Sequence, residues 1–352
     1  MNTSAADLMI FVGADLTVGV NPKVNNLITA YRQAAHDILW VLDSNVMVDR
    51  GTLARAVDIL EPAPSSPHPP LRRIGVVHHV PFAWVSKVSL GSCVEEAFLN
   101  TNHAKMYIAI NTVAVDSCVV GKSCLYRKSD LERVNGSLRP IPNAANGGCQ
   151  PGDRGLETFG RFLAEDNMIA GALWHELGLR HDLSCDVAKN AVGDMSLMDY
   201  IARRIRWIRV RKRMVFAATM AEPFTESFLA GCLASFGAKY LFKLSPLLSL
   251  PVHFLAWLYV DFDVYASLAG HPVPSSKRWP FIGAWILREL LALPIWFVAI
   301  VGREVEWRGQ RYEVLQNGEV QKAESRKGRS LLGWIRRHMG KDRDYYEPLD
   351  TR

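Results

Sequence analysis

The chain lacks the cysteine patterns that build zinc sites or disulfide scaffolds. Its six cysteines form no CxxC pair and no zinc-ligand spacing. The residues from Asn2 to Asp7 are polar and lack the charged and then apolar order of a secretory signal peptide. These absences favour reduced thiols in a domain that faces the cytosol. The six are Cys93, Cys118, Cys124, Cys149, Cys185 and Cys232.

The chain also lacks a charge-free apolar run that is long enough to cross a membrane. Crossing the hydrocarbon takes about 20 mostly apolar residues. Three apolar runs, at 224–244, 246–260 and 281–301, carry or border charged residues. They fit either membrane-inserted segments or amphipathic helices in the interface, and we expect at least two to be inserted. The charges are Glu226, Lys239 and Lys243, then Asp261, then Arg288 and Glu289.

Positive charge is gathered in two clusters, although the formal net charge is only +6. One cluster lies at 201–213 and the other at 322–343 in the tail. Such clusters suit phosphates, anionic lipid or nucleic acid. Because no recognised nucleic-acid motif accompanies them, we expect no nucleic-acid partner. A solvated, partly disordered end explains the tail cluster equally well.

Two acidic signals stand in order along the chain. Asp43 follows an apolar run, 38–42, that reads as a buried strand ending at a loop. A carboxylate there can hold a divalent metal against a diphosphate, because Mg²⁺ and Mn²⁺ prefer oxygen ligands. Glu165 and Asp166 then open an apolar helical stretch at 168–177. An aspartate at that edge can take the proton of an attacking hydroxyl.

A basic signal follows, in which Arg203, Arg206 and Trp207 have RxxRW spacing. These residues share one face of a helix because they lie three to four positions apart. Two guanidiniums can grip phosphate, and the indole can cover a ring. In this order the three signals supply what transfer from a nucleotide sugar requires. A juxtamembrane basic helix that holds lipid headgroups would give the same pattern.

Strand-like and helix-like runs alternate through the first half of the chain. This alternation predicts an α/β fold with a mostly parallel sheet flanked by helices. Ligands of such sheets bind at the carboxyl ends of strands, which is where Asp43 falls. Two loops are predicted at 61–70 and 137–156, the second being either a lid or a surface insertion. The predicted strands are 9–12, 38–42 and 74–80, and the predicted helices are 25–36 and 52–60.

Eight sequence blocks carry a family resemblance. They are GVNPKVNNL (19–27), DSN (43–45), TNHA (101–104), GKSCL (121–125), EDN (165–167), RRIRW (203–207), EP (222–223) and WRG (307–309). With these blocks the sequence resembles the ceramide glucosyltransferases, a family of membrane-bound inverting transferases with the GT-A fold, and most closely its fungal branch. The resemblance extends from about Phe11 to Tyr312.

The resemblance implies a reaction that passes glucose from UDP-glucose to the primary hydroxyl of ceramide, with inversion of the anomeric carbon. Asp166 would be the catalytic base, and Asp43 would hold Mg²⁺ or Mn²⁺ on the diphosphate. Arg203 and Arg206 would stabilise the leaving UDP, and Trp207 would wall the acceptor mouth. The partners implied are UDP-glucose, ceramide and the lipid bilayer, in the Golgi or the ER with the catalytic domain facing the cytosol.

Four further residues are implied in substrate or nucleotide binding: Lys23, Asn25, His103 and Glu165. Lys23 and Asn25 lie at a predicted helix start that favours anions, although Asn25 could instead cap that helix. Glu165 could be a helix N-terminal charge favoured by the dipole. His103 could be structural, as lone histidines often are.

The sequence divides into a GT-A-like domain at 1–222, a membrane-embedded region at 223–302 and a basic tail at 303–352. Three full spans would put the tail opposite the catalytic domain, against the positive-inside tendency, and a re-entrant third segment would remove that conflict. The family pattern also begins with an anchor, a first strand and an early aspartate motif upstream of this chain's start, so we expect low activity from this form. The alternatives are a processive polysaccharide synthase-like transferase and a catalytically inactive membrane protein of the same fold.

Overall fold

A five-stranded sheet forms the centre of the part of the chain before the apolar runs in the computed structural model. The model describes residues 9–11, 16–62, 72–138, 154–307, 310–315 and 318–323. The strand order is β1-β4-β3-β5-β2, so that β1 and β2 form the two edges. The strands are β1 (Ile38–Leu42), β2 (Val46–Met47), β3 (Ile74–Val85), β4 (Ser123–Arg127) and β5 (Arg180–Val192).

The sheet is mixed, so the prediction of a mostly parallel sheet was wrong. Among the described strands only β3 and β5 pair in parallel, while β1–β4, β3–β4 and β2–β5 are antiparallel. The strand β4, which was not predicted, lies between β1 and β3 and runs against both. Apolar runs reveal strands but not their direction, because buried strands of both kinds are rich in the same residues. The predicted strand at 9–12 was also wrong over its described part, 9–11, which forms no strand.

Helices cover the sheet where the apolar spacing predicted them. The predictions at 25–36 and 52–60 were confirmed as α1 (Pro22–Gln33) and α2 (Thr52–Leu60), although α1 begins three residues early. The start of α1 is set by Asn21, whose side chain accepts from the backbone N of Lys23 at 2.8 Å. The helix α6 (Glu165–His175) packs its apolar residues with those of α1 in one core.

A second core joins the sheet to the helices of the carboxyl-terminal half. It contains side chains from α3 (Leu90–Phe98), from α7 (Leu197–Met214) and from α11 (Arg278–Val301). The helix α3 continues through a π-helical turn, Leu99–His103, into α4 (Ala104–Val113). π-Turns are frequent at functional sites, and this one ends on His103.

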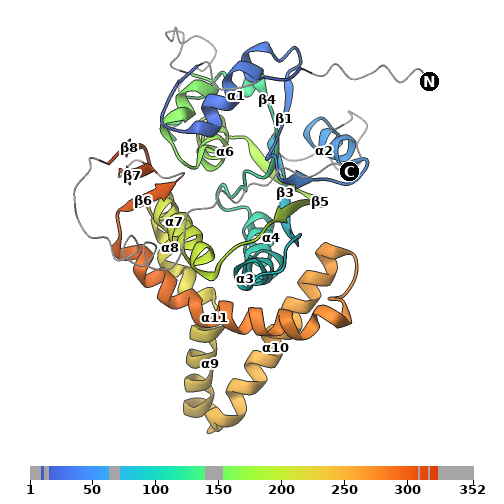
Figure 1. Cartoon of the computed structure of the whole chain (residues 1–352), viewed down its shortest axis with the longest axis vertical. Helices are drawn as coiled ribbons and strands as arrows, with labels where there is room; N and C mark the ends of the chain where they lie inside the picture. Colours follow the sequence, from blue (N-terminus) through green and yellow to red (C-terminus); the bar gives the residue numbers. More distant parts are fainter. Residues whose placement is uncertain are drawn as a thin grey trace.

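The apolar runs form three helices below the catalytic domain. They are α9 (Ser227–Phe242), α10 (Pro246–Ala269) and α11. By length and composition, α10 and the stretch Ser275–Val301 could each cross a membrane, whereas α9 is shorter. Figure 1 shows α9 and α10 projecting from the base of the molecule as a V, with α11 lying across that base.

A small antiparallel sheet follows α11. Its strands are β6 (Glu304–Trp307), β7 (Gln310–Val314) and β8 (Val320–Lys322). Its apolar side chains share a core with Val210 of α7. The basic tail beyond 323 and most of the predicted loops at 61–70 and 137–156 lie outside the described residues.

Candidate active site

Asp43 lies where the sequence placed it, directly after β1 at the edge of the sheet. Its carboxylate accepts from two ammonium groups, those of Lys122 at 2.7 Å and Lys23 at 2.9 Å. The backbone brings Lys122 there, because Asp43 N donates to Lys122 O at 3.1 Å beside the β1–β4 pair. Three segments that are far apart in the sequence therefore meet at this carboxylate.

Glu165 joins the same cluster from the first turn of α6. Its carboxylate lies 3.0 Å from the Lys23 ammonium and accepts from the Asn21 amide at 2.7 Å. The Asn21 amide also donates to Phe162 O at 2.7 Å. Glu165 is buried. Through these contacts its carboxylate links the start of α1 to the start of α6.

Asp166, the next residue, points to a different segment. Its Oδ2 accepts from the backbone N–H of Gly121 at 2.6 Å, and its Oδ1 accepts from Asn167 at 3.3 Å. A Cβ on residue 121 would lie only 2.4 Å from Asp166 Oδ2, so the close approach requires glycine. Lys23 donates to Gly121 O at 3.0 Å, so both backbone polar groups of Gly121 are held by the cluster.

The charges of this cluster shift one another's pKa values. Burial opposes a charge on Lys23, but Glu165, Asp43 and Asp166 together raise the pKa of its ammonium well above its ordinary value. Burial likewise opposes the charge on Asp43, but Lys122 and Lys23 lower the pKa of its carboxyl. Burial raises the pKa of Glu165 against the attraction of Lys23. Lys23 and Asp43 are therefore an ion pair throughout the physiological pH range.

These residues do not by themselves make a metal site. Both oxygens of Asp43 are engaged by ammonium groups, and no group of three or more histidine, cysteine, aspartate or glutamate side chains gathers as metal ligands in the described ranges. Mg²⁺ and Mn²⁺ binding by Asp43 stays a prediction.

A largely apolar cavity opens beside the cluster. Its volume is about 410 Å³, including the part open to solvent, and it is lined by Glu165, Asp166, Lys23 and Gly121 together with apolar side chains. The apolar lining includes Val41, Val76, Val119, Ile169 and Ala170. Asp166 therefore borders a space into which a reacting group could be placed.

Asn25 fixes a loop and does not cap the helix. Its side-chain oxygen accepts from the backbone N–H groups of Val18 and Gly19 at 3.0 and 3.2 Å, and its amide donates to Gly19 O at 3.0 Å. The capping role considered for Asn25 was wrong, because Asn21 caps the helix. Asn25 instead fastens the segment that leads into the site.

His103 lies in a buried aromatic and basic cluster at the end of the π-turn. Its ring centroid is 4.6 Å from that of Tyr107 and 6.0 Å from that of Trp207. Burial, together with Arg204 and other arginines of α7, lowers the pKa of His103 well below its ordinary value. Its imidazole is therefore neutral, and its Nδ1 has no hydrogen-bond partner among the residues that the structure describes.

The RxxRW residues lie on α7 beside that cluster. The Arg203 guanidinium is 3.1 Å from the fully buried carboxylate of Glu95 and lies 4.7 Å above the Trp207 ring. Trp207 packs at the margin of the core between the catalytic domain and α11. Arg206 makes polar contacts of its own. The roles predicted for these residues towards UDP and the acceptor stay predictions.

Tyr107 connects the two groups of residues. Burial raises the pKa of its phenol well above the ordinary value, and among the neighbouring charges Asp166 raises it while Arg211 lowers it. Arg211, one turn beyond Trp207, is bonded to Glu222. Tyr107 is therefore near enough to the acidic cluster and to the basic helix α7 for charges of both to act on its phenol.

Sequence reasoning missed four of these residues: Asn21, Tyr107, Lys122 and Arg211. A lysine at the start of a strand or an arginine in a basic helix has no distinguishing local pattern. The one usable signal was at Asn21, because an asparagine directly before a proline is typical of a helix start.

The comparison with known proteins is decisive for the family. The model described as Glycosyl transferase family 21 matches residues 5–142 and 153–320. The chain belongs to glycosyl transferase family 21. This family 21 chain is 37% identical to a ceramide glucosyltransferase of Komagataella phaffii over 84% of its own length and 68% of that protein.

Two further fungal relatives agree with this family. The chain is 32% identical to a ceramide glucosyltransferase of Candida albicans, over 84% of its length and 72% of the relative. It is 33% identical to one of Pyricularia oryzae, over 88% and 70%. The predicted resemblance to ceramide glucosyltransferases was therefore confirmed.

Proposed function

We propose that this family 21 chain transfers glucose from UDP-glucose to the primary hydroxyl of ceramide, with inversion, to give glucosylceramide. The observation that carries the proposal is the cluster of Asp43, Lys23, Glu165 and Asp166, which three separate segments assemble beside a cavity. The names of the fungal relatives supply the substrate class.

Asp166 is the proposed base. Its Oδ2 takes the proton of the ceramide hydroxyl while the hydroxyl oxygen forms a bond to the anomeric carbon of glucose. The bond from that carbon to the diphosphate oxygen breaks on the opposite face, and UDP leaves with the electron pair. Gly121 N–H holds the carboxylate in place through its 2.6 Å hydrogen bond.

Lys23 and Lys122 are the proposed partners of the diphosphate. Both ammonium groups lie at the Asp43 carboxylate and are fixed in position before substrate arrives. Three carboxylates, those of Asp43, Glu165 and Asp166, oppose these two cations. A further negative charge would therefore be disfavoured unless a cation came with the nucleotide, which is the physical argument for Mg²⁺ or Mn²⁺ arriving on UDP-glucose.

The lipid side of the proposal concerns α7 and the helices below it. Trp207 lies beside His103 and packs against a core that includes side chains of α10 and α11, which suits a mouth for a lipid acceptor. In the cell we propose a Golgi or ER membrane, with the catalytic domain facing the cytosol.

The test uses the full chain reconstituted in nanodiscs. Ceramide and UDP-glucose are supplied, and the lipid products are identified by mass spectrometry. A matched ceramide without its 1-hydroxyl is the control. We expect hexosylceramide when ceramide is supplied and no product when the control lipid replaces it. No lipid product would contradict the proposal and favour an inactive membrane protein, whereas release of a soluble polysaccharide would favour a polymer synthase.

A further inference from the structure

The apolar region, residues 223–302, is attached to the catalytic domain near both of its ends, and both attachments are to the same helix. At its start, Glu222 is bonded to Arg211 and lies 3.7 Å from Arg204. At its end, Lys212 donates to Ile300 O at 2.6 Å and to Gly302 O at 3.0 Å. All three basic residues belong to α7. The first and last residues of the apolar region therefore lie at one face of the catalytic domain.

The strands after α11 are also attached to the catalytic domain. Arg209 of α7 donates to Glu304 O at 2.7 Å. Glu319 forms a β-bridge with Phe162 and an ion pair of 3.1 Å with Arg161. The small sheet shares its core with α7. A chain segment that is packed in this way lies on the catalytic side of any membrane.

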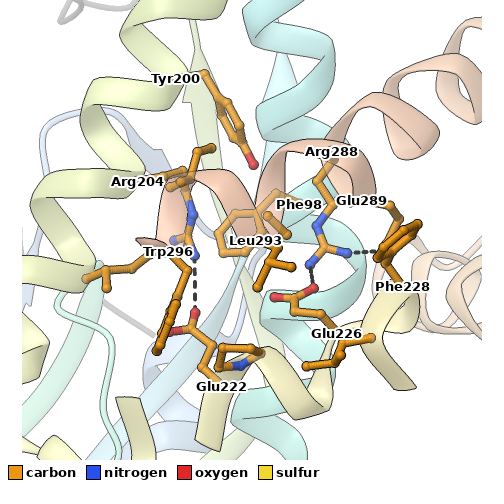
Figure 2. Close-up of a pocket in the computed structure, with 15 residues that line it drawn as sticks. Phe98, Tyr200, Arg204, Glu222, Glu226, Phe228, Arg288, Glu289, Leu293 and Trp296 are labelled. Carbon is orange, nitrogen blue, oxygen red and sulfur yellow. Dashed lines mark hydrogen bonds and ion pairs between the residues drawn. The ribbon is translucent and has the colours of Figure 1, made fainter. Parts of the chain in front are cut away.

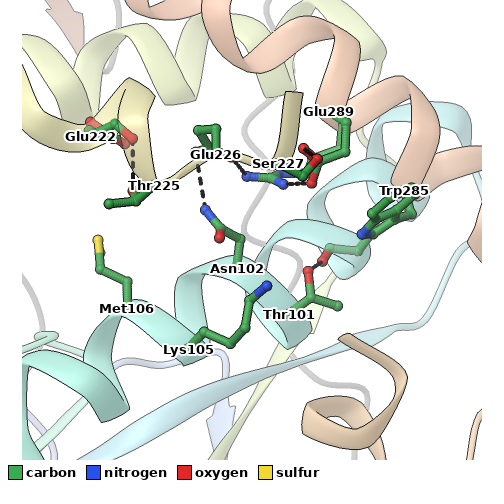
Figure 3. A network of polar contacts seen from close by, with 12 residues as sticks. Thr101, Asn102, Lys105, Met106, Glu222, Thr225, Glu226, Ser227, Trp285 and Glu289 are labelled. Carbon is green, nitrogen blue, oxygen red and sulfur yellow. Dashed lines mark hydrogen bonds and ion pairs between the residues drawn. The ribbon is translucent and has the colours of Figure 1, made fainter. Parts of the chain in front are cut away.

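The charges in the middle of α11 face protein rather than lipid. Arg288 is 1% exposed and is bonded to both Glu226 and Glu289 (Figure 2). Figure 3 shows the same network continuing from Glu226 to Asn102 of the π-turn, a contact of 3.1 Å. These contacts attach the middle of α11 to the catalytic domain.

A second polar contact anchors the upper part of α10. Trp285 of α11 donates to Asp261 at 2.7 Å, and Lys105 of α4 lies 2.6 Å from the same carboxylate. Asp261 is fully buried. Asp261 and Tyr265 of this end are therefore packed on protein, whereas the part of α10 before Asp261 has no buried residue.

The helices differ sharply in how much apolar surface they expose. The most apolar stretch of α10 is only 6% buried, whereas that of α11 is 33% buried. Exposed apolar side chains lie along both helices of the α9–α10 pair, where no described residue covers them. They include Phe236, Tyr240, Leu241, Leu247, Leu255 and Tyr259, each between 67% and 89% exposed. A surface of this kind is stable only in an apolar medium.

We propose that α11 does not cross the bilayer. The helices α9 and α10 enter the lipid as a hairpin and return, while α11 lies along the membrane surface beneath the catalytic domain. The number of crossings between α7 and β6 is therefore even, and the strands after α11 lie on the catalytic side. This proposal rests on the membrane part of the proposed function, but not on catalysis.

The arrangement also accounts for charges that a spanning helix would have to carry. If α11 crossed, Arg288 and Glu289 would sit near the bilayer centre, and Arg288 would lose its contact with Glu226. The positive cluster of the tail then follows on the cytosolic side when the catalytic domain faces the cytosol, in agreement with the positive-inside tendency.

The test is cysteine labelling of the full chain in sealed microsomes whose cytosolic face is outward. The exposed Cys185 and Cys232 are replaced by serine, and one new cysteine is added, either Arg311→Cys on β7 or Asp58→Cys on α2. Both added positions are exposed. A membrane-impermeant maleimide is applied before and after permeabilisation, and labelling of the parent without a new cysteine is subtracted.

We expect both positions to be labelled in sealed microsomes, with no increase after permeabilisation. Labelling of Asp58→Cys from outside but of Arg311→Cys only after permeabilisation would overturn the proposal. Gln310→Cys is measured alongside, so that poor reactivity at one position does not decide the result. If both positions were labelled only after permeabilisation, they would still lie on one side of the membrane, as an even number of crossings requires. The cytosolic orientation in the proposed function would then be wrong.

Discussion

Replacing Asp166 by asparagine should abolish most turnover while leaving the site assembled. The asparagine carbonyl can still accept from Gly121 N–H, so the 2.6 Å contact persists as a neutral hydrogen bond. Exchanging a charged acceptor for a neutral one should lower the free energy of unfolding by about 1 kcal/mol. The melting temperature should then fall by about 2 °C, since 1 kcal/mol moves a protein of this size only slightly.

The effect on the reaction should be much larger. A positioned base contributes about 10²- to 10⁴-fold to the rate, which is roughly 3–5 kcal/mol of activation free energy. The variant should therefore lose at least about 100-fold in kcat. Its affinity for UDP should change little, because Lys23 and Lys122 keep their contacts with Asp43.

The assay compares initial rates and UDP binding for the parent, Asp166→Asn and a matched control, Asp58→Asn. Asp58 is exposed on α2, so its substitution makes the same chemical change away from the site. The control should match the parent in rate and melting temperature. Turnover of Asp166→Asn within about threefold of the parent would refute the assignment of the base. Equal losses of UDP binding and turnover would show that Asp166 acts on binding instead.

The remaining predictions concern the groups around Asp166. Lys23→Met leaves the buried carboxylate of Glu165 without its ion-pair partner and leaves Asp43 with Lys122 alone. UDP affinity should therefore fall at least about tenfold and the free energy of unfolding by about 2–3 kcal/mol, measured by calorimetry. Unchanged affinity would remove Lys23 from the nucleotide site. Gly121→Ala pushes a Cβ against Asp166 Oδ2, so kcat should fall far more than UDP affinity, and parent-like kinetics would show that this contact is not needed. The pKa of His103 is lowered, so its unfolded form binds a proton below about pH 6.5 while its folded form does not, and stability falls as the pH drops. Between pH 7 and pH 5 the melting temperature of His103→Gln should therefore fall less than that of the parent. An equal or larger fall would contradict the burial of a neutral imidazole.

The positions of the acidic residues could be predicted from the sequence. Asp43 does follow a strand, and Glu165 and Asp166 do open a helix, because apolar periodicity places both elements. Their neighbours could not be predicted. Lys122 reaches Asp43 through the pairing of β1 with β4, and neither that strand nor its direction has a local signal.

The RxxRW spacing illustrates the same limit. It predicts that three side chains share a face of one helix, and they do lie on α7. It does not predict that Arg203 meets the buried carboxylate of Glu95, which comes from another helix. The charges in α11 are similar, because Arg288 looks like an obstacle to membrane insertion until its contact with Glu226 is known. Long-range ion pairs are set by packing, which a local pattern does not contain.

The anomeric configuration of glucose in the lipid product is the sharpest test of the proposed mechanism. In this mechanism the ceramide oxygen, deprotonated by Asp166, attacks the face of the anomeric carbon opposite the leaving UDP. Product made by the purified chain from UDP-α-glucose and ceramide would be isolated and its anomeric proton examined by NMR. We expect β-glucosylceramide. An α-linked product, or no glucosylated ceramide, would contradict the mechanism.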